Sequence, residues 1–350
     1  MKDIKEITAY LRAYDGPEIK LMEVCGTHTA AIFKNGIRSL ISPKIRLISG
    51  PGCPVCVTPT AFIDKILEYA HMENHIVCSF GDMLKVPGTN GSISSLKGEG
   101  IHVMMMYSPF DVIDAATENP DKTYVIAAVG FETTAPTYAL ALEEAESRGL
   151  KNIRLVTALK TIIPALKWIC ESEEDINGFI CPGHVSTIIG SEVYKDLAAK
   201  YKKPFVVAGF EAEHLLTVIY DIVRQIEAGG SRVDNLYTNA VRDTGNAKAQ
   251  AIIDKFFTPG PAMWRGLGII PGSGLYLRPE YAKYEGGSAG LNADMELPAS
   301  CRCGEVIVGR INPNECPMFG TGCKPESPYG PCMVSAEGAC GIWYRNRLKG

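Results

Sequence analysis

The sequence predicts an α/β fold with two parallel-sheet lobes around a cleft, followed by a small cysteine-rich region at the C-terminus. Two observations predict this arrangement. Short apolar runs, typical of buried parallel strands, alternate with helical segments along most of the chain. Such alternation implies parallel sheets with helices on both faces. The last fifty or so residues instead combine Cys, Pro and Gly with little periodicity, so they are expected to form a separate region.

The elements follow from these patterns. Helices are expected over residues 4–14, 61–71 and 138–148, and Gly149 ends the last one because glycine readily adopts the left-handed conformation found after helices. Further helices are expected between the later strands. Apolar runs predict strands at 20–24, 45–49, 75–80, 101–107, 124–129, 153–158, 178–180 and 204–208.

The length of 350 residues fits two or three domains at about 150 residues each. We expect a first α/β lobe over residues 1–118, a second over 119–240 and a C-terminal domain over 241–350. The composition, 46% hydrophobic and 21% charged, is that of an ordinary globular protein. A chain of this size buries a full core, so it does not depend on a disulfide scaffold.

The charge balance excludes several classes of partner. Lys and Arg number 35 and Asp and Glu number 39, which gives a net charge of -4 and no general affinity for nucleic acid or an anionic membrane. No apolar stretch approaches the roughly 20 residues that cross a bilayer. The charged N-terminus has no signal-peptide core. The chain is therefore expected to be soluble and cytoplasmic.

Unusual motifs follow several predicted strands, and sites in parallel α/β sheets lie outside the carboxyl ends of the strands. Their shared placement predicts one sheet edge and a cleft shared by the two lobes. Glu132, Thr133 and Thr134 are candidates to bind an anion or line this cleft. His184 is a candidate ligand or acid–base group, with a structural role as the alternative. The motifs are GPGCPVC (50–56), GDMLKVPG (81–88), GFETTAP (130–136) and PGHVS (182–186).

Twelve cysteines are many for a reducing compartment, where clustered thiols more often bind metal or carry out redox chemistry. Cys53 and Cys56 form a C-P-V-C motif at a strand-to-helix turn. That spacing lets two sulfurs cycle between dithiol and disulfide, and a helix start there would favour the attacking thiolate. The alternative is half of a zinc site, but no second CxxC pair exists.

Cys25 lies in the sequence EVCGTHTA (23–30), three residues before His28. A cysteine with a nearby histidine can act as a nucleophile or as a soft thiolate ligand for iron. A buried cysteine beside a capping threonine is the alternative. Two residues outside the cysteine motifs, Trp264 and Arg265, are expected to pack or cap between the lobes. Asp82 and Lys85 are interpreted as a plain surface pair.

Four cysteines near the C-terminus have the spacing C-x6-C-x8-C-x7-C: Cys316, Cys323, Cys332 and Cys340. Four thiolates in an irregular Gly/Pro loop suit an iron–sulfur cluster. Zinc is the alternative, although structural zinc sites usually use tight CxxC knuckles. Cys301 and Cys303 are left over, as a second thiol pair or as residues on one face of a strand.

Together these motifs resemble the HypD family of hydrogenase maturation factors, in the family's order and across nearly the whole chain. The resemblance is carried by CGTHT (25–29), GPGCPVC (50–56), GFETTAP (130–136), PGHVS (182–186) and the tail with PCMVSAEGAC (331–340). It implies a scaffold on which the Fe(CN)2CO group of [NiFe] hydrogenase is built. It further implies a complex with the chaperone HypC, and HypE as the donor of cyanide that HypF prepares from carbamoyl phosphate.

The resemblance also implies residue roles. Cys25 would hold a mononuclear iron that carries CN and CO ligands, with His28 beside it. Cys53 and Cys56 would be the redox-active pair, and the four tail cysteines would bind a [4Fe–4S] cluster, a pairing similar to that of ferredoxin–thioredoxin reductase. Two other functions stay open: a free-standing, cluster-dependent thiol–disulfide oxidoreductase, and a non-catalytic, metal-stabilised binding module.

Overall fold

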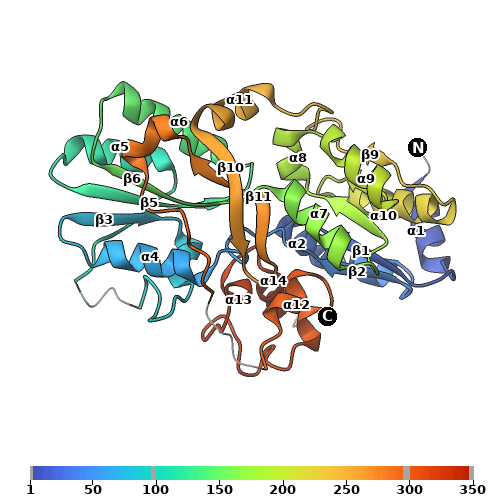
Figure 1. Ribbon diagram of the computed structural model, residues 1–350. Helices are drawn as coiled ribbons and strands as arrows, with labels where there is room; N and C mark the ends of the chain where they lie inside the picture. Colours follow the sequence, from blue (N-terminus) through green and yellow to red (C-terminus); the bar gives the residue numbers. More distant parts are fainter. Residues whose placement is uncertain (1–2, 96–99, 295–299, 347–350) are drawn as a thin grey trace.

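The computed structural model describes residues 3–95, 100–294 and 300–346. It confirms the predicted class, an α/β protein with parallel sheets and a cysteine-rich C-terminal region (Figure 1). The first sheet, sheet A, has the strand order β2-β1-β7-β8-β9, and all its neighbours are parallel. Its strands are β1 (Ile19–Glu23), β2 (Ile45–Ser49), β7 (Gly178–Cys181), β8 (Phe205–Val207) and β9 (Val233–Asn235).

The second sheet, sheet B, has the order β4-β3-β5-β6 and is also parallel throughout. Its strands are β3 (His75–Ser79), β4 (Val103–Met105), β5 (Thr123–Gly130) and β6 (Ile153–Leu159). All eight strands predicted from apolar runs are present. The prediction succeeds because a strand that is buried on both faces of a parallel sheet is apolar along its length.

The sheets do not follow the predicted segments 1–118 and 119–240. Sheet A combines β1 and β2 with three strands that come more than a hundred residues later, and the boundary at residue 118 falls inside sheet B. Each lobe is therefore assembled from separate stretches of chain. The sequence gives no local signal for this assembly. β1 pairs with both β2 and β7, and which strands pair is decided only when distant parts of the chain fold together.

Helices cover both sheets, as expected. One outer face of sheet A packs against α1 (Ile4–Ala13), α2 (Gly26–Lys34) and α10 (Ala212–Glu227). One face of sheet B packs against α5 (Pro109–Glu118), α6 (Ala135–Ser147) and α11 (Ala247–Phe256). The remaining helices include α4 (Thr60–Ala70), α7 (Ile162–Ser172), α8 (Gly183–Ile189) and α9 (Lys195–Tyr201).

One continuous cluster of buried side chains joins the two sheets. It contains Phe179 of sheet A, Val125 of sheet B and the Cys53–Cys56 segment. Along β1 the successive residues Leu21 and Met22 belong to different clusters, as the period of two along a strand requires. The loops at the strand ends are thus held by a shared core. A cleft between the lobes stays a prediction.

A two-stranded antiparallel hairpin, β10 (Phe257–Trp264) and β11 (Gly268–Leu277), was not predicted. Its strands carry Pro259, Pro261 and Pro271. Because proline has no backbone N–H to donate to a neighbouring strand, a sequence rich in proline does not predict a strand. Both strands of a two-stranded hairpin are edge strands, where proline is tolerated.

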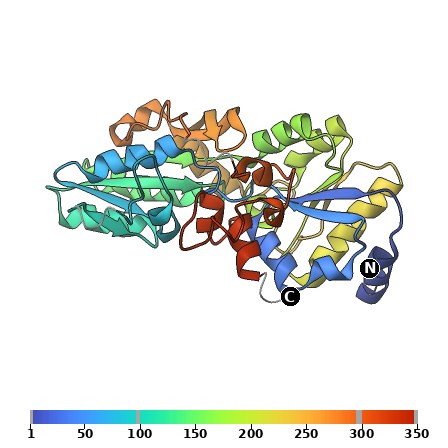
Figure 2. The same cartoon turned by 90° about the horizontal axis from the view of Figure 1, so that it is seen from below.

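The described part of the cysteine-rich region includes the short α-helices α12 (Cys303–Ile307), α13 (Pro331–Val334) and α14 (Ala339–Asn346) and a 3-10 turn at Pro313–Glu315. Two views at right angles place it between the two sheets, below the hairpin (Figures 1 and 2). In the described part of the chain, no helix has the length and apolarity that crossing a membrane requires.

Candidate functional site: a disulfide beside a six-cysteine cavity

Three of the predicted motifs meet at one edge of sheet A. CGTHT follows β1, GPGCPVC follows β2 and PGHVS follows β7, and these three strands are neighbours. Two other motifs belong to sheet B, since GDMLKVPG follows β3 and GFETTAP follows β5. Of the four motifs predicted to share one edge, GPGCPVC and PGHVS do so, together with CGTHT, whereas GDMLKVPG and GFETTAP lie at the other sheet, because a linear pattern does not show which sheet a strand joins.

Cys25 caps the N-terminus of α2 and is buried. Burial raises the pKa of its thiol, although the backbone amides of His28 and Thr27 donate toward the sulfur and oppose the increase. The predicted support from His28 thus comes from its main chain. The Cys25 sulfur lies at the start of α2, where the positive end of the helix dipole also favours a negatively charged thiolate, such as one bound to a cation.

The His28 ring points to a different part of the core. Its Nε2 lies 3.3 Å from the carbonyl oxygen of Ala208, and its ring packs 4.8 Å from the ring of Phe210. The same phenyl ring lies 4.2 Å from the ring of His184. Burial lowers the pKa of His28 to about 4, so this imidazole is neutral near pH 7. The rings of His28 and His184 therefore both pack against the phenyl ring of Phe210.

Cys53 and Cys56, the predicted pair, are joined by a disulfide with their Cα atoms 5.3 Å apart. The Cys56 amide donates to the Cys53 sulfur over 3.2 Å. The expected helix start at this motif was wrong, because the segment forms turns and α4 begins only at Thr60. Pro54 and Pro59 explain this, since the residue before each proline is disfavoured in helical conformation.

The disulfide segment rests directly on the Cys25 loop. A Cβ atom on Gly52 would lie 2.6 Å from the Cys25 nitrogen and 2.6 Å from the Val24 carbonyl carbon. On the other side, a Cβ atom on Gly26 would overlap the backbone of Glu337 in the tail. Glycine is therefore required at both positions for three chain segments to come this close.

We expect Gly52→Ala to destabilise the protein by about 1–3 kcal/mol, the usual cost of forcing extra volume into a packed site. The contacting atoms are backbone and cannot swing aside. Denaturant unfolding followed by circular dichroism measures the effect. Gly81→Ala is the matched control, since its Cβ would meet only the Met105 sulfur at 3.5 Å, an ordinary contact. Equal midpoints for the two variants would contradict the close packing.

A small cavity connects these segments. We call it the motif cavity. Cys53 and Cys56 line it on one side and Cys332 of the tail lines it on another. The other lining residues are Gly26, Thr29, Ser49, Gly50, Pro51, Ile307, Glu337 and Ala339. The disulfide, the CGTHT helix and the tail thus share one enclosed space.

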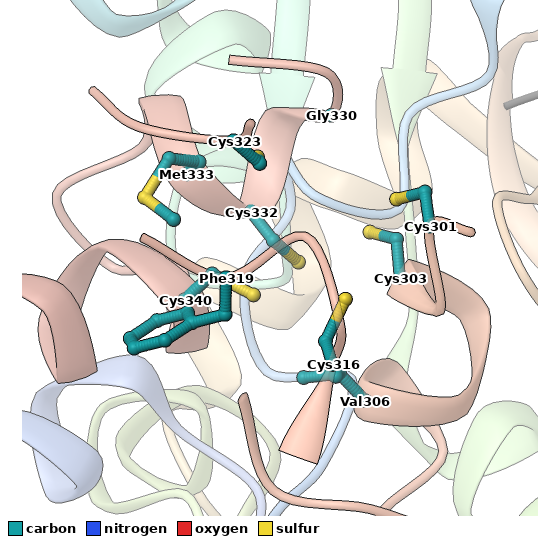
Figure 3. Close-up of a pocket in the computed structure, with 10 residues that line it drawn as sticks. All are labelled: Cys301, Cys303, Val306, Cys316, Phe319, Cys323, Gly330, Cys332, Met333 and Cys340. Carbon is teal, nitrogen blue, oxygen red and sulfur yellow. The ribbon is translucent and has the colours of Figure 1, made fainter. Parts of the chain in front are cut away.

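A second cavity, the cysteine cavity, lies inside the C-terminal region, and side chains from several turns of the tail project into it (Figure 3). All six tail cysteines line it, and the remaining lining residues carry no charge. Cys301 and Cys303, which sequence reasoning left over, are therefore part of this site. The lining residues are Cys301, Cys303, Val306, Cys316, Phe319, Cys323, Gly330, Cys332, Met333 and Cys340.

The six thiols are not equivalent. A hydrogen bond from the Cys332 thiol lowers the pKa of Cys303, and the same contact, together with one to Cys340, raises the pKa of Cys332 well above its ordinary value. Burial raises the pKa of Cys301 to about 12. Cys332 is thus in contact with Cys303 and Cys340, and it lines both cavities.

The placement of the metal-binding side chains limits which metal centre this region can hold. Within residues 3–95, 100–294 and 300–346, no three His, Cys, Asp or Glu side chains are placed to hold a single metal ion. A four-iron cluster is larger than one ion and takes its thiolates from farther apart. Six thiols around one apolar cavity are a donor set that suits such a cluster.

The GFETT motif lies near the others through Tyr194, which is fully buried. The Tyr194 hydroxyl lies 2.9 Å from the Ser186 hydroxyl of PGHVS. Burial raises its pKa well above the ordinary value, and the charges of neighbours, among them Glu132 and Cys25, add to the increase. The Tyr194 phenol therefore contacts PGHVS directly, whereas residues of GFETT and CGTHT act on it only through their charges.

The individual GFETT side chains have different positions. Glu132 accepts a hydrogen bond from the Ile162 amide over 2.8 Å, its other carboxylate oxygen has no partner in the described structure, and burial raises its pKa to about 7. It also lines a separate cavity, with Thr161 and Asp243. Thr133 and Thr134 are half-buried, and Thr134 caps α6.

Sequence reasoning missed two charged residues at the site. Glu23, at the end of β1, is fully buried and accepts hydrogen bonds from Thr29 (3.0 Å) and Ser49 (2.9 Å), both of which line the motif cavity. Asp82 is exposed, as predicted, but its carboxylate also accepts hydrogen bonds from Ser335 and the Ala336 amide of the tail. The sequence did offer a signal for Glu23, because this carboxylate stands two residues before Cys25 of the CGTHT motif.

Comparison with known proteins agrees with this arrangement. The family model described as "HypD: Hydrogenase formation hypA family" matches residues 2–347. The Hydrogenase maturation factor HypD of Escherichia coli K12 is 40% identical over 351 residues, which cover 99% of this chain and 94% of the relative. Those of Azotobacter vinelandii and Rhodobacter capsulatus are 40% and 39% identical, covering 97% and 99% of this chain and 93% and 94% of the relatives. The chain belongs to the HypD family of hydrogenase maturation factors.

Proposed function

We propose that this protein is the scaffold on which the Fe(CN)2CO group of [NiFe] hydrogenase is assembled, in complex with the chaperone HypC. HypE would donate cyanide, which HypF prepares from carbamoyl phosphate. The observation that carries the proposal is the motif cavity, which brings the CGTHT helix, the Cys53–Cys56 disulfide and Cys332 of the cysteine cavity to one place. A thiol that binds iron and a thiol pair that stores electrons would then serve the same reaction.

In this proposal Cys25 holds the iron that is being built into the group. Iron that carries cyanide and CO is low-spin and soft, and a thiolate is a matching ligand. Cys25 is buried at the start of α2, where burial raises the pKa of its thiol and the amides of His28 and Thr27 partly offset that increase. The surrounding protein keeps water away from this position.

The Cys53–Cys56 pair, once reduced to the dithiol, would supply electrons two at a time. Two electrons and two protons convert the disulfide to two thiols, and the reverse step returns them to the reaction at iron. Four of the six tail cysteines would hold a [4Fe–4S] cluster, predicted as Cys316, Cys323, Cys332 and Cys340. When bound, this group supplies electrons one at a time.

A second candidate is a cluster-dependent thiol–disulfide oxidoreductase that acts on another protein. The observation in its favour is the same disulfide beside the cysteine cavity. This function needs a protein disulfide as substrate and needs no iron at Cys25. The two candidates therefore differ in iron content and in the chemistry at Cys25.

Infrared spectroscopy of the anaerobically prepared complex with HypC tests the proposal. We expect Fe–CN and Fe–CO bands, with about five iron atoms per chain from one four-iron cluster and one mononuclear iron. About four iron atoms without these bands would favour the oxidoreductase. Zinc in place of iron would contradict both and leave a metal-stabilised binding module.

A further inference from the structure

Arg265 lies in the turn of the hairpin between β10 and β11, and only 2% of its surface is exposed. Its backbone amide donates to the Val57 carbonyl oxygen over 2.9 Å, and its Nε donates to the Thr58 carbonyl oxygen over 3.1 Å. These are the two residues that follow Cys56. The side chain therefore holds the end of the disulfide segment.

The other end of the guanidinium fork fixes the start of α4. Nη2 donates to the Thr60 hydroxyl over 2.8 Å and lies 3.1 Å from an Asp294 carboxylate oxygen. The same Asp294 oxygen accepts hydrogen bonds from the Thr60 amide and hydroxyl. The buried fork thus fixes Thr58 and Thr60, and the Arg265 backbone amide fixes Val57 beside them.

The hairpin turn also reaches the cysteine-rich region. A Cβ atom on Gly266 would lie 2.9 Å from the Gly304 Cα, beside Cys303 at the start of α12. Arg265 is consequently the buried cation at the junction between the disulfide segment and the tail. Its charge is permanent, and charges act over longer distances in a protein interior than in water.

The fork is not fully paired. Nη1 is buried and has no hydrogen-bond partner among the described residues. Asp294 is the carboxylate in ion-pair contact with the guanidinium, and 19% of its side chain is exposed, which weakens its compensation of the charge. A net positive field is therefore expected on the Cys53–Cys56 segment.

We propose that Arg265 is a positioning residue that sets the reduction potential of the Cys53–Cys56 disulfide. This inference rests on the proposed redox function of that pair. Reduction consumes two electrons from a dithiol or an iron–sulfur donor and breaks the S–S bond. It leaves two sulfurs that take up two protons, or one proton when one sulfur stays a thiolate. The Arg265 charge stabilises that thiolate, and its fork holds Thr58 and Thr60, which follow Cys56 in the chain.

Equilibration with dithiothreitol buffers at pH 8.5, where an ordinary cysteine is about half ionised, measures the potential. Alkylation and mass spectrometry of the peptide containing both cysteines then give the reduced fraction. For Arg265→Met we expect the equilibrium constant for reduction to fall at least about tenfold, which is about 30 mV for a two-electron couple. Arg265→Lys retains the charge and should lie closer to wild type.

Asp294→Asn is the matched variant of opposite sign. It keeps an oxygen acceptor for Thr60 and Arg265 but removes the compensating charge, so the disulfide should become easier to reduce. A merely structural role would shift both variants in the same direction. If Arg265→Met does not fold, Asp294→Asn decides alone.

Three results are distinguishable. Opposite shifts for the two variants support the inference. Unchanged potentials, or shifts of one sign, overturn it while a reducible wild-type disulfide keeps the proposed function. A wild-type disulfide that dithiothreitol does not reduce overturns the redox function itself and this inference with it.

Discussion

Replacing Cys25 with alanine is expected to abolish the Fe–CN and Fe–CO infrared bands of the complex with HypC and to stop hydrogenase maturation. Alanine offers iron no donor atom, whereas a thiolate is a strong ligand for soft iron. The fold should survive, because the exchange removes one sulfur from a site that three backbone segments define. The cluster proposed for the cysteine cavity would have its own ligands there, so its iron should be retained.

The control is Cys78→Ala. Cys78 is equally buried but lies on β3 of the other sheet, where burial alone raises the pKa of its thiol. This variant should retain the bands. His28→Ala should be milder than Cys25→Ala, because the contact of His28 with the sulfur is through its backbone amide, which the exchange preserves. Normal bands in Cys25→Ala would move the iron to other thiols.

The sequence predicted the strands well because a buried parallel strand leaves a simple trace, a short run of apolar residues. It could not predict their partners. Residues 19–49 and 178–235 form one sheet although the other sheet separates them in the chain. Partner choice depends on long-range hydrogen bonds and packing, and a single sequence carries no local signal for either.

The same distinction holds for the site. Cys53 and Cys56 were predictable as a pair because three residues of separation brings two sulfurs together regardless of context. Arg265 was noticed only as a packing residue, since its role depends on contacts with residues about two hundred positions earlier. Cys301 and Cys303 were left over because spacing counts positions along the chain, whereas a cavity is defined by positions in space.

If the cysteine cavity holds the proposed [4Fe–4S] cluster, the anaerobically purified protein should be brown, and serine substitution in the cavity should bleach this colour and destabilise the C-terminal region. The tail has only short helices, and a metal centre that binds the folded state contributes its binding free energy to folding. Cys323→Ser should therefore lose most of its visible absorbance and its cluster iron. Cys170→Ser is the control, because this buried thiol lies on α7, outside the cavity.

Two further variants decide which thiols are ligands. The predicted set contains Cys332, but Cys332 contacts Cys303 and also lines the motif cavity, a position suited to thiol exchange with the disulfide. If Cys332 serves that exchange, the fourth ligand is Cys301 or Cys303, the two other thiols of the cavity. Cys332→Ser then keeps its absorbance and either Cys301→Ser or Cys303→Ser loses it, whereas the predicted set requires the reverse. Full absorbance in Cys323→Ser would remove Cys323 from either set, and with it the assignment of the cluster to the C-x6-C-x8-C-x7-C spacing.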